Sequence, residues 1–281
     1  MKKFLIIVLS LVIVGLSVAV VFKWRPEEDP YAGNYVFVTG EERLEVASQV
    51  SSLIENTKNV NTEMTGNAHA TYTQASYTVN MNMGSHSILD YTDPDRPIAY
   101  QKYTLEIKEK SSQLMIFMEM DMYVDAVEDM LYVDYYDCMK VGRDILSENR
   151  KKGYLIYSES EGVSANEMMA MNQINSQFDL ETILKDIQFS EVNVSVSGNK
   201  IKVVETGKTE GDATYYIIND NDSYRAKKEM VLRNVANTGS DLFLVTEIKT
   251  TDKTISLPKN LEAYSEKFEI EDDDDWFDLD W

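Results

Sequence analysis

The sequence predicts an α+β fold: a curved antiparallel β-sheet with helices packed on one face, preceded by one N-terminal membrane helix. Three observations lead to this prediction. An uncharged apolar run opens the chain, apolar residues at three- and four-residue steps follow it, and long stretches of alternating polar and apolar residues fill most of the remainder. Side chains repeat every two residues in strands and every 3.6 in helices, so these patterns distinguish the two kinds of element.

The first predicted element is the apolar run over residues 4–22, which two lysines precede. A helix of this length rises roughly 28 Å, close to the hydrocarbon thickness of a bilayer. The lysines keep the N-terminus inside, so the rest of the chain is expected to be exported. Residues 1–24 are either a signal anchor, which Trp24 at an interfacial position favours, or a signal peptide cleaved near Ala19. The expected location is the cell membrane, single-pass with the domain outside, or else secretion after cleavage.

Breakers such as Pro26 and Gly33 indicate a linker over residues 25–40, and a single extracytoplasmic α+β domain is predicted over residues 41–268. Helical periodicity predicts helices over 41–59 and 164–188. Alternation predicts one meander between these helices, with strands at 62–73, 76–83, 86–91, 98–109, 112–124 and 129–140. A second meander is predicted at 189–197, 200–206, 212–220, 224–234 and 241–251, with a last short strand at 255–257.

This order of elements resembles the LolA/LppX-like superfamily of bacterial envelope proteins. The matching stretches are residues 44–65, the run MLYVDYY at 130–136, and TISLP at 254–258. The resemblance covers about residues 41–265. It implies a half-barrel sheet whose concave face is partly closed by helices, with a cavity that takes acyl chains or lipids. The chain departs from the lipoprotein members because no cysteine lies directly after its apolar run.

Composition argues against several classes of function. The net charge of −21 opposes binding to nucleic acid, whose affinity comes largely from neutralised phosphates. The chain contains no Gly-rich phosphate loop, no Gly-x-Ser-x-Gly elbow and no His-Glu-x-x-His motif. We therefore expect a protein that is not an enzyme, with no catalytic residues, no metal ligands and no cofactor.

Methionines form the most distinctive candidate site. They alternate along two predicted strands, so each group lies on one face of its strand. Methionine is flexible and polarizable, and a methionine-lined face adapts to irregular apolar ligands. Five residues are therefore predicted to line a cavity for a lipid-like or other apolar ligand. They are Met81, Met83, Met118, Met120 and Met122.

Two other interpretations of these methionines stay open. The first is ordinary packing between a sheet and a helix. The second is a copper(I) site at Met81, Met83 and His86, because thioethers favour that ion.

The C-terminal segment 269–281 is the second candidate site. It mixes eight acidic residues with Trp276, Phe277 and Trp281. Charge repulsion opposes its folding alone, so we expect a disordered acidic-aromatic tail. Such segments dock on partner surfaces, although a solubilising end would look similar.

Two functional hypotheses follow from these sites. The leading one is an extracytoplasmic, membrane-anchored binding module for a lipid-like or other apolar ligand. The alternative is an envelope protein-interaction or sensory partner that acts through the tail 269–281. The partners expected are thus an apolar ligand, an envelope protein, and the membrane through the N-terminal helix.

The only cysteine, Cys138, falls on a predicted strand and has no partner for an internal disulfide. We expect it to be a small buried hydrophobic residue rather than a nucleophile. Alkylation by iodoacetamide should therefore be much slower in the native protein than in denaturant. Equal rates under the two conditions would reveal an accessible thiol and contradict this prediction.

Overall fold

The computed structural model describes residues 29–56, 60–74, 77–156, 158–159, 164–165, 180–189, 191–208, 211–220, 223–233 and 240–268. The predicted signal segment 1–24 and the predicted tail 269–281 lie outside the described residues. Within the described part of the chain, no helix is long and apolar enough to cross a membrane.

The chain divides into two units, Met1–Asn34 and Tyr35–Trp281. The described part of the first unit, residues 29–34, is a turn. In this turn Asp29 accepts hydrogen bonds from the backbone N–H groups of Tyr31, at 3.0 Å, and Ala32, at 2.9 Å.

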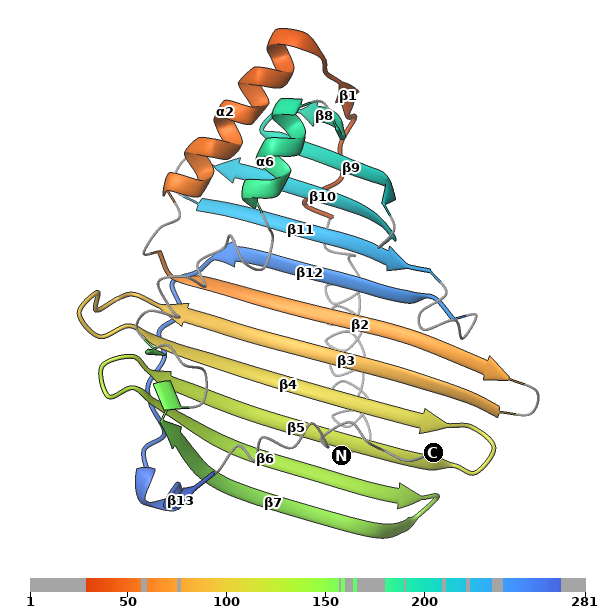
Figure 1. Ribbon diagram of the computed structural model, residues 1–281, viewed down its shortest axis with the longest axis vertical. Coiled ribbons are helices and arrows are strands. Elements are labelled where there is room, and N and C mark those ends of the chain that lie inside the picture. The colour runs from red at the N-terminus through yellow and green to blue at the C-terminus, as the bar shows by residue number, and fades with distance from the viewer. Residues whose placement is uncertain are drawn as a thin grey trace, which may run out of the picture. The chain divides into compact units, whose positions relative to one another are not determined.

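The second unit is built on one sheet of thirteen strands (Figure 1). In chain order these are β1 (Val36–Phe37), β2 (Thr62–Gln74), β3 (Tyr77–Asp90), β4 (Ile98–Glu109), β5 (Leu114–Asp125), β6 (Met130–Val141), β7 (Asp144–Ile156), β8 (Asn193–Ser197), β9 (Lys200–Lys208), β10 (Gly211–Asp220), β11 (Ser223–Leu232), β12 (Leu242–Thr250) and β13 (Glu266–Lys267). Their order in space is β1-β8-β9-β10-β11-β12-β2-β3-β4-β5-β6-β7-β13. Two helices, α2 (Gly40–Asn56) and α6 (Leu180–Phe189), and the 3₁₀ turn η2 (Leu261–Ala263) complete the described elements.

The predicted α+β fold with a membrane helix was therefore wrong. Strands dominate the described residues, and the two meanders form a single sheet because β12 pairs with β2. The main core joins the helices α2 and α6 to strands β8–β12, whereas β3–β7 have neither helix against them in that core. Periodicity identifies helices and strands one at a time, but it carries no information on how much of a sheet the helices cover.

Cross-strand register divides the sheet into two faces. Paired residues lie side by side on the same face, and Met64, Ser87 and Gln101 form one such row across β2, β3 and β4. We call this side the apolar face. It carries the even-numbered residues of β2, β5, β11 and β12 and the odd-numbered residues of β3, β4, β6, β9 and β10. The opposite side is called the charged face.

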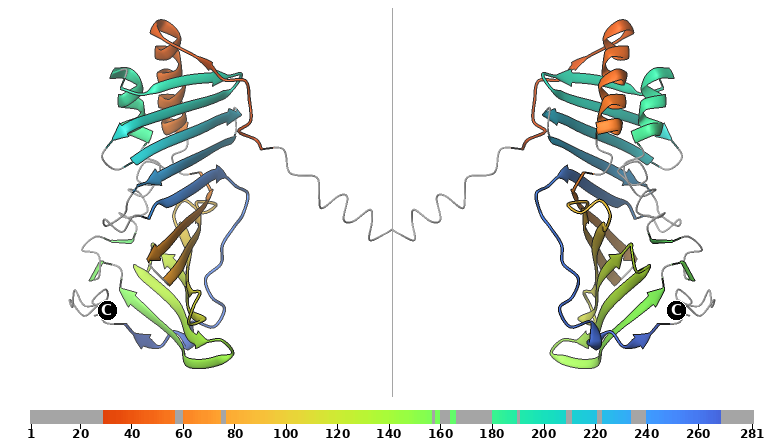
Figure 2. Two further views of the ribbon diagram at one scale, coloured as in Figure 1. Left: turned by 90° about the vertical axis from the view of Figure 1, so that its right-hand side faces the viewer. Right: turned by 90° about the vertical axis from the view of Figure 1, so that its left-hand side faces the viewer.

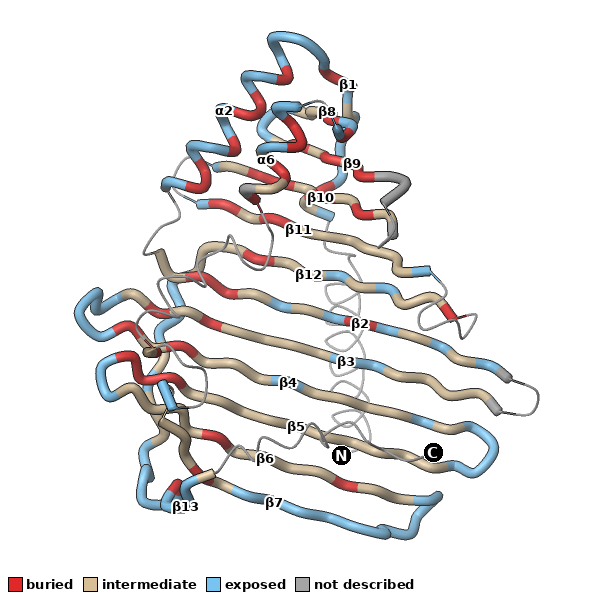
Figure 3. The backbone as a smooth tube through the Cα atoms, viewed as in Figure 1, coloured by how far each residue is buried: buried red, intermediate tan, exposed pale blue. Residues whose placement is uncertain are grey.

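The main hydrophobic core lies where the two helices meet the apolar face at one end of the sheet (Figure 2). Helix α2 contributes Val46, Val50 and Leu53, and helix α6 contributes Leu180, Ile183 and Ile187. Against them pack side chains of the apolar face, including Val194, Val203, Ile217 and Ala226. Burial is concentrated here, while the middle of β4 and β5 is only partly buried (Figure 3).

A buried arginine joins the two helices. The guanidinium of Arg43, in the first turn of α2, donates to the carbonyl oxygens of Ile187 at 2.5 Å and Asp186 at 3.2 Å. These carbonyls lie near the C-terminus of α6, where backbone acceptors lack helical partners and a cation is favourable. Arg43 thereby fixes the position of α2 relative to α6.

One strand continues through a residue expected to break it. The sequence predicted separate strands at 76–83 and 86–91, yet both belong to β3, which passes through Gly84. A Cβ at this position would lie 2.6 Å from Oγ1 of Thr104 on the adjacent strand β4. The glycine therefore permits close packing between neighbouring strands, which a sequence pattern does not distinguish from a turn.

Two further segments, strand β7 and residues 255–257, also differ from expectation. Strand β7 was not predicted, because Asp144–Arg150 are exposed throughout and show no alternation. The expected strand at 255–257 is irregular, and the backbone N–H of Ile255 instead donates to Oδ2 of Asp90 at 2.7 Å. By contrast, Cys138 is buried on β6, as predicted.

Replacing Ile183 with alanine should test the core. Ile183 is 1% exposed between α6 and the sheet, so the truncation leaves a cavity. We expect the free energy of unfolding in urea to fall by about 2–5 kcal/mol. The matched change Gln188→Ala, at an exposed position on the same helix, should alter it by about 0.5 kcal/mol or less. Similar losses in both variants would contradict the assigned packing.

Candidate functional site

The apolar face continues from the core across β12 and β2–β6, and all five methionines of the predicted site lie on it. Met83 is opposite Leu105, which is in turn opposite Met118, so the three residues form one row. Met120 and Met122 lie in the next rows along β5, and Met81 lies one row away on β3. Pairing of β3, β4 and β5 thus brings two groups of methionines, distant in sequence, onto one surface.

A pocket of about 370 Å³ opens on this surface. Three of the predicted methionines, Met83, Met118 and Met120, line it, while Met81 and Met122 lie on the same face outside its lining. The other apolar and aromatic lining residues were not predicted. They are Ala68, Tyr103, Leu105, Tyr135 and Leu244. They come from β2, β4, β6 and β12, and cross-strand register alone makes them neighbours.

Large side chains on this part of the face remain accessible. Met83 is 37% exposed and Tyr103 is 44% exposed, although each is flanked by strands on both sides. At the strand ends the situation differs, since Ala165 packs against Ala99 and Val124 in a second small core. An apolar surface that stays accessible in the middle of a sheet is typical of a binding site.

The polar groups of the pocket are few. Ser85 and Thr246 contribute hydroxyls, and Tyr135 contributes a phenol. Burial raises the pKa of the Tyr135 phenol and the charge of Asp137 raises it further, so the phenol is neutral at pH 7. Glu119 also borders the pocket, but its carboxylate lies on the charged face and forms an ion pair with Lys102 at 2.8 Å. The pocket therefore presents an apolar lining with a small number of hydrogen-bonding groups.

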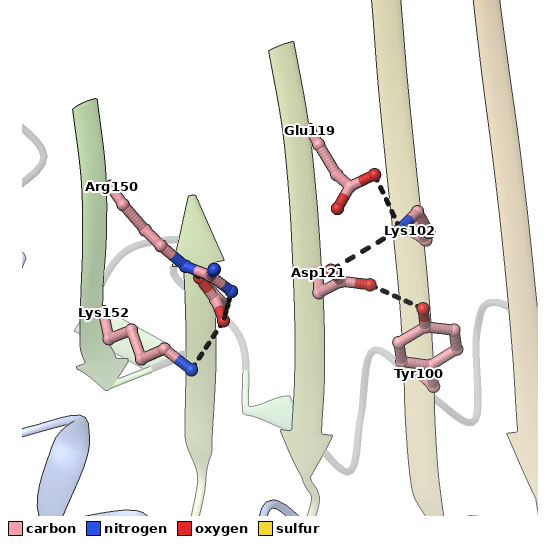
Figure 4. Close-up of polar contacts among 7 residues, drawn as sticks. Tyr100, Lys102, Glu119, Asp121, Arg150 and Lys152 are labelled. Carbon is pink, nitrogen blue, oxygen red and sulfur yellow. Dashed lines mark hydrogen bonds and ion pairs between the residues drawn. The ribbon is translucent and has the colours of Figure 1, made fainter. Parts of the chain in front are cut away.

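The charged face carries a network of balanced ion pairs (Figure 4). Lys102 lies 2.8 Å from Glu119 and 3.7 Å from Asp121, and Asp121 accepts a hydrogen bond from the Tyr100 hydroxyl at 2.6 Å. On the next strands Asp134 pairs with Lys152 at 2.6 Å and with Arg150 at 3.1 Å. Three acids and three bases thus neutralise one another.

The pKa of Asp134 reflects this pairing. Burial alone would raise the pKa of Asp134, but hydrogen bonds from Arg150 and Lys152 hold it below its ordinary value. A carboxylate held ionised by two cations is unsuited to proton transfer, and we assign this network to the structure of the sheet.

The copper(I) interpretation of the methionines does not fit the geometry. His86 lies on the charged face, where its Nε2 is 2.9 Å from Oε1 of Glu63. Met81 and Met83 lie on the apolar face. Within the described ranges, no group of three His, Cys, Asp or Glu side chains is placed to hold a metal ion.

Glu63 is a buried carboxylate with three basic side chains around it. It is 6% exposed, its Oε1 accepts hydrogen bonds from His86 and Lys253, and Nζ of Lys249 lies 3.4 Å from its Oε2. Burial by itself would raise the pKa of Glu63, but these partners together lower it to about 2. Lys253 belongs to the segment that follows β12, so its ion pair with Glu63 holds that segment against the charged face.

Comparison with known proteins gives distant structural matches. No protein-family model matches the chain, and no curated protein matches it. The translocator domain of the autotransporter NalP from Neisseria meningitidis is 7% identical, over 74% of this chain and 95% of that one, with a TM-score of 0.22. A DUF1329 family protein from Desulfovibrio piger is 8% identical, over 78% and 96%, with a TM-score of 0.20. Such scores show a coarse resemblance between β-rich chains and carry no argument about function.

Glu63 should make stability depend on pH. Its pKa is lower in the folded protein, so its contribution to stability is present above about pH 5 and disappears as the pH falls through about 2. Glu63→Gln should lower the free energy of unfolding by about 1–3 kcal/mol at pH 7. In urea titrations at several pH values, the two proteins should converge toward pH 2.

The control for this experiment is Glu229→Gln, which removes a carboxylate paired with Lys227 at 2.8 Å on a more exposed site. That change should cost no more than about 1 kcal/mol. Parallel curves for the wild type and Glu63→Gln at every pH would refute the assigned role of Glu63.

Proposed function

We propose that this protein is a binding module for an apolar, lipid-like ligand, which it holds on the apolar face at the methionine-lined pocket. The supporting observation is the pocket itself. Its volume of about 370 Å³ and its apolar lining with a few hydroxyls are those of a small-molecule site. Met83, Met118 and Met120 provide a flexible surface that adapts to an acyl chain.

The energetics favour a long chain over a short one. Each buried methylene contributes about 0.8 kcal/mol, while association costs about 4–15 kcal/mol in lost freedom. Between roughly 5 and 19 methylenes are needed to offset that cost. A ligand with a long alkyl chain therefore fits this surface better than a small apolar molecule.

Core packing explains the surface less well. Helices α2 and α6 pack over β8–β12, and Ala165 packs against the row that contains Ala99 and Val124. Among the described residues, the centre of the apolar face around Met83 and Tyr103 is not buried. A methionine surface that is left accessible is better suited to bind than to fill a core.

The other parts of the functional hypothesis remain predictions. An extracytoplasmic location rests on the N-terminal apolar run, residues 4–22, and on the lysines before it. The absence of enzymatic activity and an interaction through the tail 269–281 also stay predictions, because both concern properties that the described residues do not test.

Two methionines on opposite faces of β5 provide a test. Met120 lines the pocket, whereas Met115 lies on the charged face between Lys108 and Lys140. Met120→Glu should weaken binding of a fluorescent fatty acid of about twelve carbons at least tenfold, because a carboxylate is costly in an apolar site. Met115→Glu should leave the affinity unchanged.

Melting curves must accompany these binding titrations. Both variants should melt within a few degrees of the wild type, since neither methionine belongs to the main core. A wild-type protein that does not bind the fatty acid, or equal affinities in all three proteins, would reject the proposed function.

A further inference from the structure

The C-terminal segment passes from one face of the sheet to the other beside β7, where β13 forms the edge of the sheet. Tyr264 lies on the charged face, where its ring packs edge-on against Tyr132 with centroids 5.8 Å apart, and Nζ of Lys152 is 5.3 Å from the ring centroid. Strand β13 then pairs in parallel with Gly153 and Tyr154 (Figure 1).

Phe268, immediately after β13, has reached the apolar face. Its backbone N–H donates to the carbonyl oxygen of Tyr154 at 2.9 Å. Gly153 is opposite Val133, in the row of the apolar face that contains Met122. A Cβ at Gly153 would lie 2.7 Å from Cε2 of Phe268, so the ring occupies the space that a side chain on that face would take.

The remaining chain is long enough to reach the pocket from this point. Thirteen residues, 269–281, follow Phe268, and Trp276 to Trp281 lie eight to thirteen positions beyond it. An extended chain covers about 3.3 Å per residue, which gives roughly 26–43 Å. Tyr103 on β4 is three strands from β7, a distance of roughly 14 Å at the usual strand spacing.

The chemistry of the tail matches that of the surface. The indole and phenyl rings of Trp276, Phe277 and Trp281 are apolar groups that make favourable contacts with methionine sulfur. Two lysines flank the pocket on the same face. Lys228 on β11 is opposite Thr246, and Lys151 on β7 is opposite Tyr135. Both Thr246 and Tyr135 line the pocket.

Lys151 is the nearer of these two lysines to Phe268. It is exposed, and among the described residues no carboxylate forms an ion pair with it. The acids of the tail must cross this edge of the sheet to reach the pocket. Lys151 therefore offers them a cation on the shortest path from Phe268.

We propose that the tail 269–281 docks on the apolar face of its own chain, with Trp276, Phe277 and Trp281 at the methionine-lined pocket. The tail then competes with the apolar ligand for that surface. The competition rests on the proposed function, whereas the docking does not. An occupant attached to the same chain acts at a high effective concentration, so weak contacts are enough to keep the tail in place.

Photocross-linking of the full-length chain in lipid nanodiscs tests the docking. Phe277→p-benzoylphenylalanine keeps an aromatic ring and adds a benzophenone, which reacts well with methionine. Mass spectrometry should find cross-links within one chain to Met83, Met118 or Met120, and few to Met115 on the charged face. Cross-links mainly to Met115, to another molecule, or to segments away from the apolar face would overturn the proposal.

Ligand titration of the triple variant Trp276→Ser, Phe277→Ser, Trp281→Ser tests the competition. Fatty-acid affinity should rise at least threefold relative to the wild type, because the internal competitor is lost. An unchanged or weaker affinity overturns the competition. If neither protein binds fatty acid while the cross-links to the pocket persist, the proposed function fails and the docking stands.

Discussion

The pairing of β12 with β2 is the interaction on which the rest of the structure depends. Nine paired positions, from Leu242 opposite Ala70 to Thr250 opposite Thr62, join the C-terminal meander to the N-terminal one. Without this ladder the chain would form two sheets, each with an additional open edge. With it, the apolar side chains of both meanders belong to a single face, one end of which carries the helices and the core.

That continuity determines how the apolar face is used. At the end formed by β8–β11, helices α2 and α6 bury the centre of the face, where Val194 and Val203 are 0% exposed. Toward β5 the same face is only partly buried and holds the pocket. The core under α2 and α6 thus stabilises one end of the sheet, while the neighbouring part of the same face is left accessible. We regard this separation of a packed region from an accessible pocket as the central feature of the fold.

The charged face has the opposite role, because its polar groups bind one another. Asp134 pairs with two cations, and Glu63 is enclosed by His86, Lys249 and Lys253. Partly buried charges of this kind are stable only when they are matched, and here the matching partners come from adjacent strands and from the segment after β12. The segment that follows β12 is therefore directed over the charged face to β7, which determines where the C-terminal residues cross to the apolar face.

The sequence by itself determined the local features of this protein. Alternation located β4 at its observed bounds and placed Met118, Met120 and Met122 on one face of β5, because side-chain direction within a strand depends only on position along it. It also predicted the burial of Cys138. Tertiary structure alone decided which strands are neighbours, so Leu105 and Leu244 could not be assigned to the pocket in advance. The same limit applies to Gly84 and Gly153, since a glycine that signals a turn and one that allows close contact look alike until the contacting chain is in place.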